Sequence, residues 1–518
     1  MKKFIYILLF GFFASSCSSF LDVKPDKTGN SDIYHIDQLV DLMGNPYMYI
    51  TIGGTAYVWT ELVFASDDCE ISPYYYLKGG IGDVSYGVSI WNKPTFDTEN
   101  VEGCTWQSAY KNMFTFNVVL ENVDKVLQTT LQKKEMVRGE ALFARAYFHF
   151  CALVAFAKYD ENAPGIGYRD NTSPNSTPTR ETVKYTLNRI AKDIDDAEKA
   201  LTLAGKTQFE QKRNFRITLP TLYAFKARFE LYRGNYSDAL DASQKALNGH
   251  SKLVDFKNDP LYKIYNPLDI NILDKTGAPT GKKLHYYEMT DLLSEGSKAV
   301  SEYEELYLPH VTDMYFSDRV VPISKDLYDI FNKKDDERWK RFYNNNYNIA
   351  KVGSLSKDGF KYEDQINLNP WEYHSYHRFI IKNSYSGKLY IVGPTTAEMM
   401  LIKAECLARE GKTLQAQATL RELRQTRFTT IESANDIGGS VQDVLDERRR
   451  ELTAIFRWYD IKRLNGRENA NITITKKRLT NISDKSSPII ITELKPNDPF
   501  YALPITTPQL TLMGWENN

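Results

Sequence analysis

The stretch that most constrains the fold is residues 396 to 427, which read TAEMMLIKAECLAREGKTLQAQATLRELRQTR. In each half, three apolar residues fall at i, i+4 and i+7, a spacing that places them on one helical face. These residues are Met400, Ala404 and Leu407 in the first half, and Ala416, Leu420 and Leu423 in the second. Gly411 stands between the halves, where a glycine commonly ends a helix. The pattern predicts two antiparallel helices joined by a tight turn.

An earlier stretch, residues 218 to 247, repeats this pattern. Its matching residues are Tyr223, Ala227, Gly234, Ala239 and Ala246, at the offsets of Met400, Ala404, Gly411, Ala416 and Leu423. Small residues on both sides of a turn glycine allow two helices to pack closely, as in a tetratricopeptide repeat of about 34 residues. We therefore expect a mostly α fold in which tetratricopeptide-like helical hairpins form a scaffold.

Other helical patterns flank the two hairpins. We expect helices from Ser31 to Met43, from about residue 105 to 123, and from about residue 133 to 157. The last of these is apolar nearly all round, so it should lie in the interior of the helical stack. We interpret His149 within it as a core histidine with satisfied hydrogen bonds, since no second metal ligand neighbours it in sequence.

The sequence predicts two further helices, one from a capping residue and one that carries a charged run. Thr179 is the expected N-cap of a helix that ends near Leu201. Residues 441 to 464 read as one long helix whose charged run, 447 to 451, forms a solvated or ion-paired face. Asp446 and Arg450 have the favourable i, i+4 spacing within it.

Two regions lack helical periodicity. Residues 66 to 96 hold aromatic residues among Gly and Pro, and residues 249 to 395 carry only short helices such as Lys325 to Phe331. A long insertion between two halves of a helical solenoid often builds the binding surface. We therefore expect one domain over residues 17–518, with helical repeats at about 105–248 and 396–465 and a loop-rich insertion at about 249–395 that builds the ligand face.

The N-terminus has the pattern of an export signal, residues 1–16. Two lysines precede an apolar run from Phe4 to Phe13, which is too short to span a bilayer, since a spanning helix needs about 20 residues. Small residues then lead to Cys17, an ending similar to a bacterial lipobox. We expect lipidation at Cys17, which would attach the protein stably to a membrane. The alternative is an ordinary signal in which Cys17 is incidental.

Charge and cysteine content limit the function classes. The chain has 65 basic and 66 acidic residues and a net charge of −1, so nucleic acid is not an expected partner. Cys151 and Cys406 lie in apolar helical runs, where buried free thiols are expected. Cys69 and Cys104 form the one candidate disulfide, and the sequence leaves open whether they pair. No cofactor or zinc motif is present.

Several segments, taken in order, resemble the SusD/RagB family of Bacteroidetes outer-membrane lipoproteins. They are the lipobox followed by FLDVKPD, TWQSAYKNMFTFNVVLENV (105–123), RGEALFARAYFHFCALV (138–154), residues 177–201, 218–247 and 323–342, EMMLIKAECLAREG (398–411), DERRRELTAIFRWYDIKRL (446–464), and the tail YALPITTPQL (501–510). Their shared order is specific and covers nearly the whole chain. The chain departs from the family at residues 454–456, where an acidic residue and a Gly are common, and at Leu503 in the tail.

This resemblance implies a cell-surface, lipid-anchored protein of the outer membrane of a Gram-negative, Bacteroidetes-like cell. Family members bind glycans, or in some branches peptides, and deliver them to a TonB-dependent transporter of the SusC type. They are not enzymes. The expected partners are therefore a SusC-like transporter, a glycan and the outer membrane, and the alternative is an oligopeptide-binding member that serves a peptide importer.

Two aromatic segments have the chemistry of a glycan-binding surface, because sugars stack on flat rings and hydrogen-bond to carboxylates, amides and Arg. The candidate ligand-binding residues are Asp67, Asp68, Tyr74, Tyr75, Tyr76 and Trp91 in the first segment, and Trp371, Tyr373, Tyr376 and Arg378 in the second. The alternative is that the rings only pack loops against helices. Consecutive Tyr74, Tyr75 and Tyr76 cannot all point inward, which favours at least one exposed ring.

Other chemistries have weaker support. The chain contains no G-x-S-x-G, H-E-x-x-H, P-loop or G-x-G-x-x-G motif. His374 and His377, beside Glu372, would suit a metal only on a helix, and Pro370 argues for a loop. A glycoside hydrolase and a repeat adaptor without a small ligand stay as further hypotheses, because paired carboxylates are identified only by their separation in space.

Overall fold

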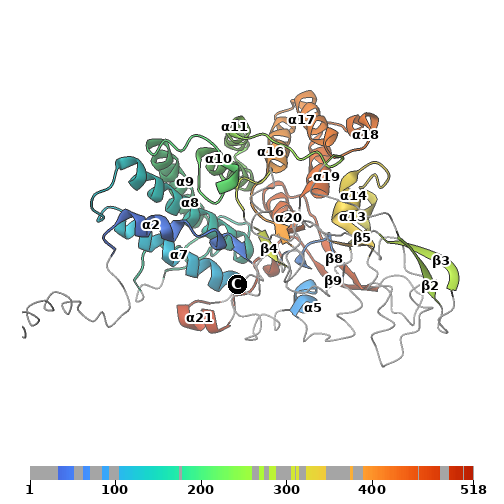
Figure 1. Cartoon of the computed structure of the whole chain (residues 1–518). Helices are drawn as coiled ribbons and strands as arrows, with labels where there is room; N and C mark the ends of the chain where they lie inside the picture. Colours follow the sequence, from blue (N-terminus) through green and yellow to red (C-terminus); the bar gives the residue numbers. More distant parts are fainter. Residues whose placement is uncertain are drawn as a thin grey trace, which may run out of the picture.

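The structure is a computed structural model and is mostly helical (Figure 1). It describes residues 33–51, 62, 64–70, 84–92, 104–173, 178–258, 268–273, 279–286, 305–309, 311–313, 323–345, 374–376, 389–452, 454–478, 489–505 and 507–516. In Figure 1 the N-terminal helices lie on the left, the C-terminal helices α16 to α19 lie on the right, and β2 and β3 lie at the far right. Cys17 and the rest of the predicted export signal lie outside the described residues.

The N-terminal part of the scaffold is built around one buried helix. Its helices are α2 (Ile36–Met43), α7 (Cys104–Asn122), α8 (Leu131–Phe156) and α9 (Val183–Leu203). Helix α8 contacts both α7 and α9, and every residue from Gly139 to Phe156 is buried, as its apolar composition predicts. It is the one helix in the described chain that is long and apolar enough to cross a membrane, but its apolar window is 100% buried. That burial identifies α8 as a core helix.

His149 on α8 is a core histidine with satisfied hydrogen bonds, which confirms the prediction. The side chain is fully buried, its Nδ1 lies 2.8 Å from the Arg145 carbonyl oxygen, and its Nε2 accepts a 3.0 Å hydrogen bond from the Arg169 N–H. The ring also stacks on Tyr168 at 3.9 Å between centroids. Both nitrogens are therefore used with the proton on Nδ1, and burial lowers the pKa of His149 to about 3.

Helix α9 begins three residues later than the sequence predicts. The N-cap is Thr182, whose hydroxyl accepts a 3.1 Å hydrogen bond from the Tyr185 N–H, in place of Thr179. The residue before the cap is already paired, because the Glu181 carbonyl accepts a 2.7 Å hydrogen bond from the Gly165 N–H. This pairing holds the preceding chain extended and so delays the helix start.

The two predicted hairpins are present. They consist of α10 (Leu219–Arg233) with α11 (Tyr236–Gly249), and of α16 (Thr396–Arg409) with α17 (Thr413–Gln425). The turn glycines Gly234 and Gly411 both have φ of 77°, a left-handed conformation that glycine adopts without a steric cost. In the second hairpin, Gly411 and Lys412 donate backbone hydrogen bonds to Ala408 and Leu407, which closes the end of α16.

The hairpins stack on each other although the long insertion separates them in sequence. Helix α11 packs against α16, and a cluster of buried, mostly small side chains lies between α10, α11 and α16. Arg228 on α10 also forms a bidentate ion pair with Glu398 on α16, at 2.8 and 2.6 Å. The predicted positions Ala227, Ala239 and Ala246 belong to this cluster and are fully buried. Close packing of small residues therefore joins the two halves.

The predicted long helix at residues 441–464 is two helices. Helix α19 (Val441–Glu451) ends at Leu452, which has extended backbone angles, and α20 (Ala454–Glu468) follows at once. A short helix, α18 (Ile431–Asn435), precedes them. The charged run is buried and ion-paired, which confirms the second of the two readings. Arg450 pairs with Glu447 at 2.8 Å, whereas Asp446 accepts a hydrogen bond from Gln442, so the predicted pair of Asp446 with Arg450 was wrong.

Residues 305–307, within the insertion, are paired with its C-terminal end beside α16. Tyr307 donates a 3.0 Å backbone hydrogen bond to Pro394, and Thr396 donates one of 2.9 Å to Glu305. The described elements of the insertion are β2 (Leu268–Leu273), β3 (Pro279–Tyr286), β4 (Val311–Asp313), α13 (Lys325–Asp329), α14 (Glu337–Phe342), β5 (Tyr343–Asn345), β6 (His374–Tyr376) and β7 (Leu389–Ile391). The short helices agree with the sequence, but the strands were not predicted.

Most of the strands belong to the insertion and pair with one another. A three-stranded sheet has the order β1–β4–β7, with β1 (Ile50–Thr51) parallel to β4 and β7 antiparallel to it. Two antiparallel pairs, β2 with β3 and β5 with β6, lie in the insertion. The remaining short elements before α7 are η1 (Pro46–Met48) and α5 (Val84–Ser89). Helix α5 falls in residues 66–96, where the sequence gave no helical signal.

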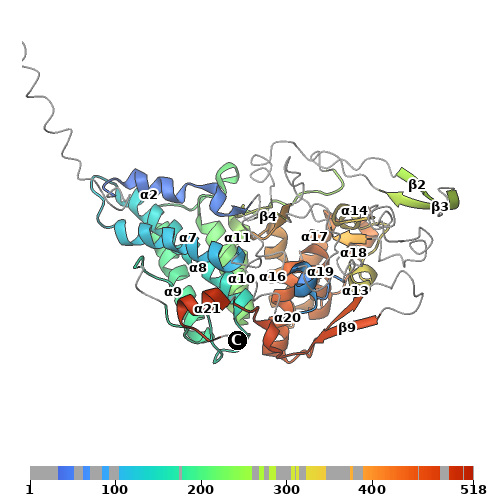
Figure 2. The same cartoon turned by 90° about the horizontal axis from the view of Figure 1, so that it is seen from below.

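The C-terminal segment returns to the N-terminal helices. It contains β8 (Ile474–Arg478), β9 (Ile489–Leu494), η7 (Pro499–Tyr501) and α21 (Thr507–Met513). Figure 2 shows α21 beside the N-terminal helices. Leu503 donates a 2.9 Å backbone hydrogen bond to Ala155 of α8, and the Trp515 ring meets the Trp106 ring edge-on at 5.6 Å. The tail therefore fixes the far ends of the chain to one core.

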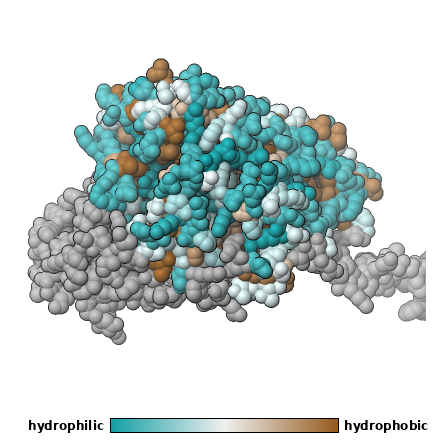
Figure 3. All heavy atoms as spheres, turned by 180° about the vertical axis from the view of Figure 1, so that it is seen from behind, coloured by the Kyte–Doolittle hydropathy of each residue, from teal (hydrophilic) through white to brown (hydrophobic). Residues whose placement is uncertain are grey.

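The described cysteine thiols are free, and the surface is mainly polar. Cys69, Cys151 and Cys406 are buried free thiols, so the candidate disulfide between Cys69 and Cys104 is not formed. The surface drawn in colour in Figure 3 is mainly hydrophilic, with apolar spots that are small and scattered. Single exposed apolar residues such as Leu414 are common on protein surfaces and do not indicate an interface.

The buried neutral His149 predicts an acid-sensitive core. An unfolded histidine gains a proton near pH 6.5, whereas the folded one does so only near pH 3, so stability falls as pH falls between these values. We expect the free energy of unfolding to drop by about 2 kcal/mol from pH 7 to pH 5 through this residue. Urea denaturation at both pH values measures the drop. The His149→Asn variant should show a shallower pH slope, and an unchanged slope would contradict the prediction.

Replacing the two turn glycines by alanine should lower the free energy of unfolding by different amounts. Gly411→Ala should lower the free energy of unfolding by about 1–2 kcal/mol, because the new Cβ has open space and only the left-handed φ is strained. Gly234→Ala should cost more, since its Cβ would meet the Arg467 Nε at 2.0 Å. Gly205→Ala, also left-handed with open space, is the control for strain alone. Equal losses for Gly234 and Gly411 in urea denaturation would refute this account.

Candidate functional site

The first predicted ligand segment is fixed to the scaffold by its two aspartates. Asp67 accepts two hydrogen bonds from Arg457 on α20, at 2.8 and 2.7 Å, and Asp68 pairs with Arg449 on α19. Burial alone would raise the pKa of Asp67, but Arg457 and Arg449 hold it well below the ordinary value. Asp67 is therefore ionised and paired at neutral pH.

The backbone of the same segment is held as well. Lys476 on β8 is buried and donates to the carbonyl oxygens of Ser66 and Cys69, the latter at 2.6 Å. The Asp68 carbonyl accepts a 2.8 Å hydrogen bond from the Ser324 N–H. The side chain of Asp68 is only 2% exposed and that of Asp67 is 17% exposed. These two residues act first as anchors, and a ligand contact by either stays a prediction.

Trp91 lies just after α5 and points into the core. It is 7% exposed and has a left-handed φ of 52°, and its backbone N–H donates to Val88 at 3.1 Å. A side chain so deeply buried does not offer a flat face to a sugar in this structure. The burial favours the packing alternative for Trp91 over an exposed platform.

The second predicted segment contributes strand β6. Tyr376 on β6 is paired with Tyr343 on β5, and His374 is paired with Asn345. His374 lies on a strand and not on the helix that the metal site would require, while His377 lies outside the described residues. Helix α14 directly precedes β5 in the chain, so the position of β6 depends on how α14 is held.

Most of the predicted aromatic residues fall outside the described part of the chain. Tyr74, Tyr75, Tyr76, Trp371, Tyr373 and Arg378 lie there, and the side chain of Tyr376 is also not described. Their ligand-binding roles stay predictions. The structure does describe the buried residues that hold the bases of the two segments, and we call these residues the platform.

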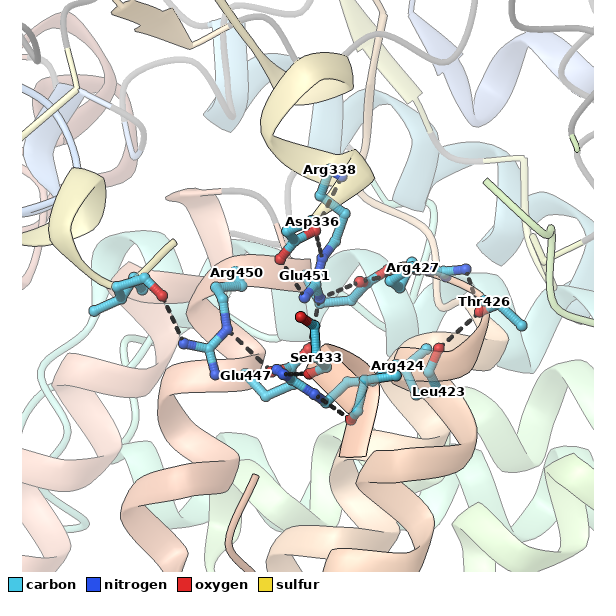
Figure 4. A network of polar contacts seen from close by, with 12 residues as sticks. Asp336, Arg338, Leu423, Arg424, Thr426, Arg427, Ser433, Glu447, Arg450 and Glu451 are labelled. Carbon is cyan, nitrogen blue, oxygen red and sulfur yellow. Dashed lines mark hydrogen bonds and ion pairs between the residues drawn. The ribbon is translucent and has the colours of Figure 1, made fainter. Parts of the chain in front are cut away.

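A buried ion network forms that platform (Figure 4). Arg338, at the start of α14, is fully buried and forms a bidentate pair with Asp336, with both nitrogen–oxygen distances at 2.8 Å. Its Nη1 also lies 2.7 Å from Glu447 and 2.8 Å from Glu451, both on α19. Arg338 therefore ties the base of the second segment to α19.

The carboxylates of α19 are shared with the second hairpin. Glu447 also accepts hydrogen bonds of 2.8 Å from Arg424 on α17 and from Arg450. Glu451 pairs with Arg427, which is just beyond α17 and contacts Glu305 at 2.7 Å. The network thus joins four guanidinium groups to the four carboxylates of Glu305, Asp336, Glu447 and Glu451.

The charge balance of the network explains how it tolerates burial. Burial would raise the pKa of Glu447, but Arg338, Arg450 and Arg424 hold it well below the ordinary value. Burying a charge without a partner is strongly unfavourable, whereas a hydrogen-bonded group of opposite charges offsets most of that cost. The network is therefore stable only as a complete set.

Helix α19 consequently supports both candidate segments. Arg449 on one side pairs with Asp68 in the first segment, and Glu447 and Glu451 on the other side hold Arg338 below the second. The sequence did not identify Arg449 and Arg457, which hold the two aspartates, or Arg338, which holds the base of the second segment. The charged run at 447–451 was the available signal, yet it does not identify partners that are distant in sequence.

The described residues hold no metal-ligand cluster, but they form cavities elsewhere on the scaffold. Among them, no group of three or more His, Cys, Asp or Glu side chains is placed to hold a metal ion. Two adjoining cavities are present. The larger, of about 660 Å³, lies between α9, α10 and α20, and the smaller, of about 210 Å³, lies between α20, the chain after α8 and residues 497–501.

Family models match two long parts of the chain. Residues 19–231 match a model described as "Starch-binding associating with outer membrane", and residues 296–514 match the SusD family. A curated relative, SusD-like protein P38 of Formosa agariphila, is 24% identical over 399 residues, which cover 72% of this chain and 73% of the relative.

Solved structures share the fold. A SusD superfamily protein from Bacteroides thetaiotaomicron has a TM-score of 0.60 at 16% identity, covering 93% of this chain and 99% of its own. A SusD-like carbohydrate binding protein from Bacteroides vulgatus has a TM-score of 0.57 at 14% identity, covering 93% and 97%. Surface glycan-binding protein A from Bacteroides uniformis has a TM-score of 0.59 at 14% identity, covering 93% and 98%.

The network predicts a large penalty for removing one charge. Glu447→Gln should lower the free energy of unfolding by about 3–5 kcal/mol, because three guanidinium groups lose their shared carboxylate in a buried site. Glu410→Gln is the control, since Glu410 pairs with Lys412 at the surface and should cost less than about 1 kcal/mol. Urea denaturation compares the two variants, and similar losses would exclude a structural role for the network.

Proposed function

This chain belongs to the SusD/RagB family, and from that premise we propose that it is a cell-surface glycan-binding lipoprotein. It captures an oligosaccharide or polysaccharide and delivers it to a SusC-like TonB-dependent transporter. Support comes from the matching family models and from relatives whose names state carbohydrate or glycan binding. The protein acts by binding, as SusD-like proteins do, and not as an enzyme.

One observation supports the location of the ligand face most directly. The two segments richest in sugar-binding side chains are both anchored to α19, through Arg449 and through Arg338. Segments held on one rigid helix keep their relative position, and a preorganised surface loses less entropy when a flexible glycan binds. The ligand face therefore lies over the insertion, with Trp371, Tyr373, Tyr376 and Arg378 as its main contacts.

The proposal also assigns the remaining parts of the chain. Residues 1–16 are the signal peptide, Cys17 carries the lipid, and residues 17–518 form the SusD-like domain. The lipid holds the protein at the outer membrane beside the transporter. The stacked hairpins α10–α11 and α16–α17 provide the rigid frame that faces the transporter.

Calorimetric titration of the mature protein with a panel of polysaccharides and oligopeptides tests this function. We expect at least one glycan to bind, and Trp371→Ala to weaken binding about tenfold or more, because a stacked aromatic ring supplies on the order of 1 kcal/mol beyond the area that it buries. Tyr185→Ala is the control, since Tyr185 is an exposed aromatic residue on α9, away from both segments. Binding of peptides but no glycan would overturn the proposal in favour of the peptide importer, and release of reducing sugar would overturn the non-enzymatic role.

A further inference from the structure

The larger cavity is a polar hollow on the scaffold, at the junction of the N-terminal helices and α20. Its volume is about 660 Å³, within the range of about 300–1,000 Å³ that is usual for small-molecule sites. It is lined by the start of α9, the end of α10, the end of α20 and the chain after α8. In both cartoon views α10 lies between α9 and α20 (Figures 1 and 2).

The positive charges around the hollow are already used. Lys462 donates to the carbonyl oxygens of Val154 and Ala157 at the end of α8, at 2.6 and 2.5 Å. Arg467 donates at 3.0 Å to the Arg233 carbonyl at the end of α10. These cations satisfy helix ends, where the backbone carbonyls lack partners within the helix.

The other charged groups are balanced. Lys184 lies 3.5 Å from Glu161 and Arg233 lies 3.4 Å from Glu230, while the carboxylate of Asp160 also lines the hollow. An anionic ligand would find no unpaired cation among these and would meet Asp160. The electrostatics therefore favour an uncharged ligand.

Three asparagine side chains supply unused hydrogen-bonding groups. Asn188, Asn469 and Asn497 line the hollow and are exposed, and their amides make no hydrogen bond to any other residue of the described chain. Each amide offers two donors and one acceptor oxygen. Asn469 and Asn497 also have left-handed φ values of 51° and 68°.

A fixed aromatic ring forms one wall. The Tyr159 hydroxyl donates a 2.6 Å hydrogen bond to the Tyr232 carbonyl oxygen, and the two rings meet nearly edge-on at 5.0 Å. The Tyr159 ring also lies so close to Gly466 that a Cβ there would be 2.4 Å from its Cδ1. The ring is thus held in place while the side chain stays partly exposed.

We propose that this hollow is a second carbohydrate site, which binds one or two neutral sugar units independently of the insertion. A fixed aromatic ring offers a surface for the apolar C–H face of a sugar, and the asparagine amides match its ring of hydroxyls. Lys184, Arg233 and Arg467, the cations among the described residues that line the hollow, each have a partner, which disfavours acidic sugars and phosphates.

The test uses variants that keep the backbone. Asn469→Gly with Asn497→Gly removes two amides while glycine retains the left-handed φ at no steric cost. Asn471→Gly is the matched control, because Asn471 also has a left-handed φ, of 54°, but does not line the hollow. Thermal unfolding of each variant verifies that the fold is intact.

The probes are glucose, galactose, N-acetylglucosamine, maltose and cellobiose, measured by saturation-transfer NMR and calorimetry on the mature protein. We expect at least one to bind the native chain, a loss of tenfold or more in the double variant, and no change in Asn471→Gly. Binding that is unchanged in the double variant, or absent from all five sugars, would overturn the second site.

The two proposals fail separately. If Trp371→Ala weakens polysaccharide binding but leaves the small sugars bound, both sites stand. If the small sugars bind while no polysaccharide does, the hollow stands and the proposed function does not. If Trp371→Ala removes binding of both kinds, the sugars occupy the insertion face and the second site is excluded.

Discussion

The arrangement of the C-terminal half depends on the buried carboxylate of Glu447. It accepts contacts from Arg338, Arg424 and Arg450, so one side chain connects the insertion, the second hairpin and α19. Related buried pairs repeat this arrangement, with Arg463 on α20 bound to Glu405 on α16 at 2.6 and 2.8 Å. Directional ion pairs fix the angles between helices, whereas apolar burial supplies most of the free energy of folding. The ion pairs therefore give the scaffold its defined geometry, while apolar burial stabilises it.

The helical hairpins were predictable from sequence because their signals are local. Apolar spacing and a turn glycine lie within about 34 residues, and both hairpins form where the pattern places them. The break between α19 and α20 was not predictable, since the helical pattern continues through Leu452 and the partners of the charged run lie elsewhere in the chain. The strand pair β2–β3 was missed although Leu268, Ile270 and Ile272 alternate with polar residues, a signal of strand.

The candidate site shows the same limit. The sequence suggested Asp67 and Asp68 as ligand-binding residues, but it did not reveal that Arg457 and Arg449 pair with them. Trp91 has the chemistry of a sugar platform, and its burial depends on tertiary packing that no local pattern encodes. Residue type therefore indicates which chemistry is available, while the distant partners decide whether a side chain serves the frame or a ligand.

The way the insertion is attached to the scaffold determines which of its residues can vary in sequence and length. Backbone hydrogen bonds from Tyr307 to Pro394 and from Thr396 to Glu305 bring residues 305–307 beside residues 394–396, so the segment between them begins and ends at one place on the scaffold. Between these points, residues other than buried anchors such as Asp336 and Arg338 can be gained, lost or replaced while α11 stays packed directly on α16. The cost of closing a longer loop grows only slowly with its length. The parts of this segment outside the buried anchors are thus exchangeable, and specificity can diverge while the frame stays the same.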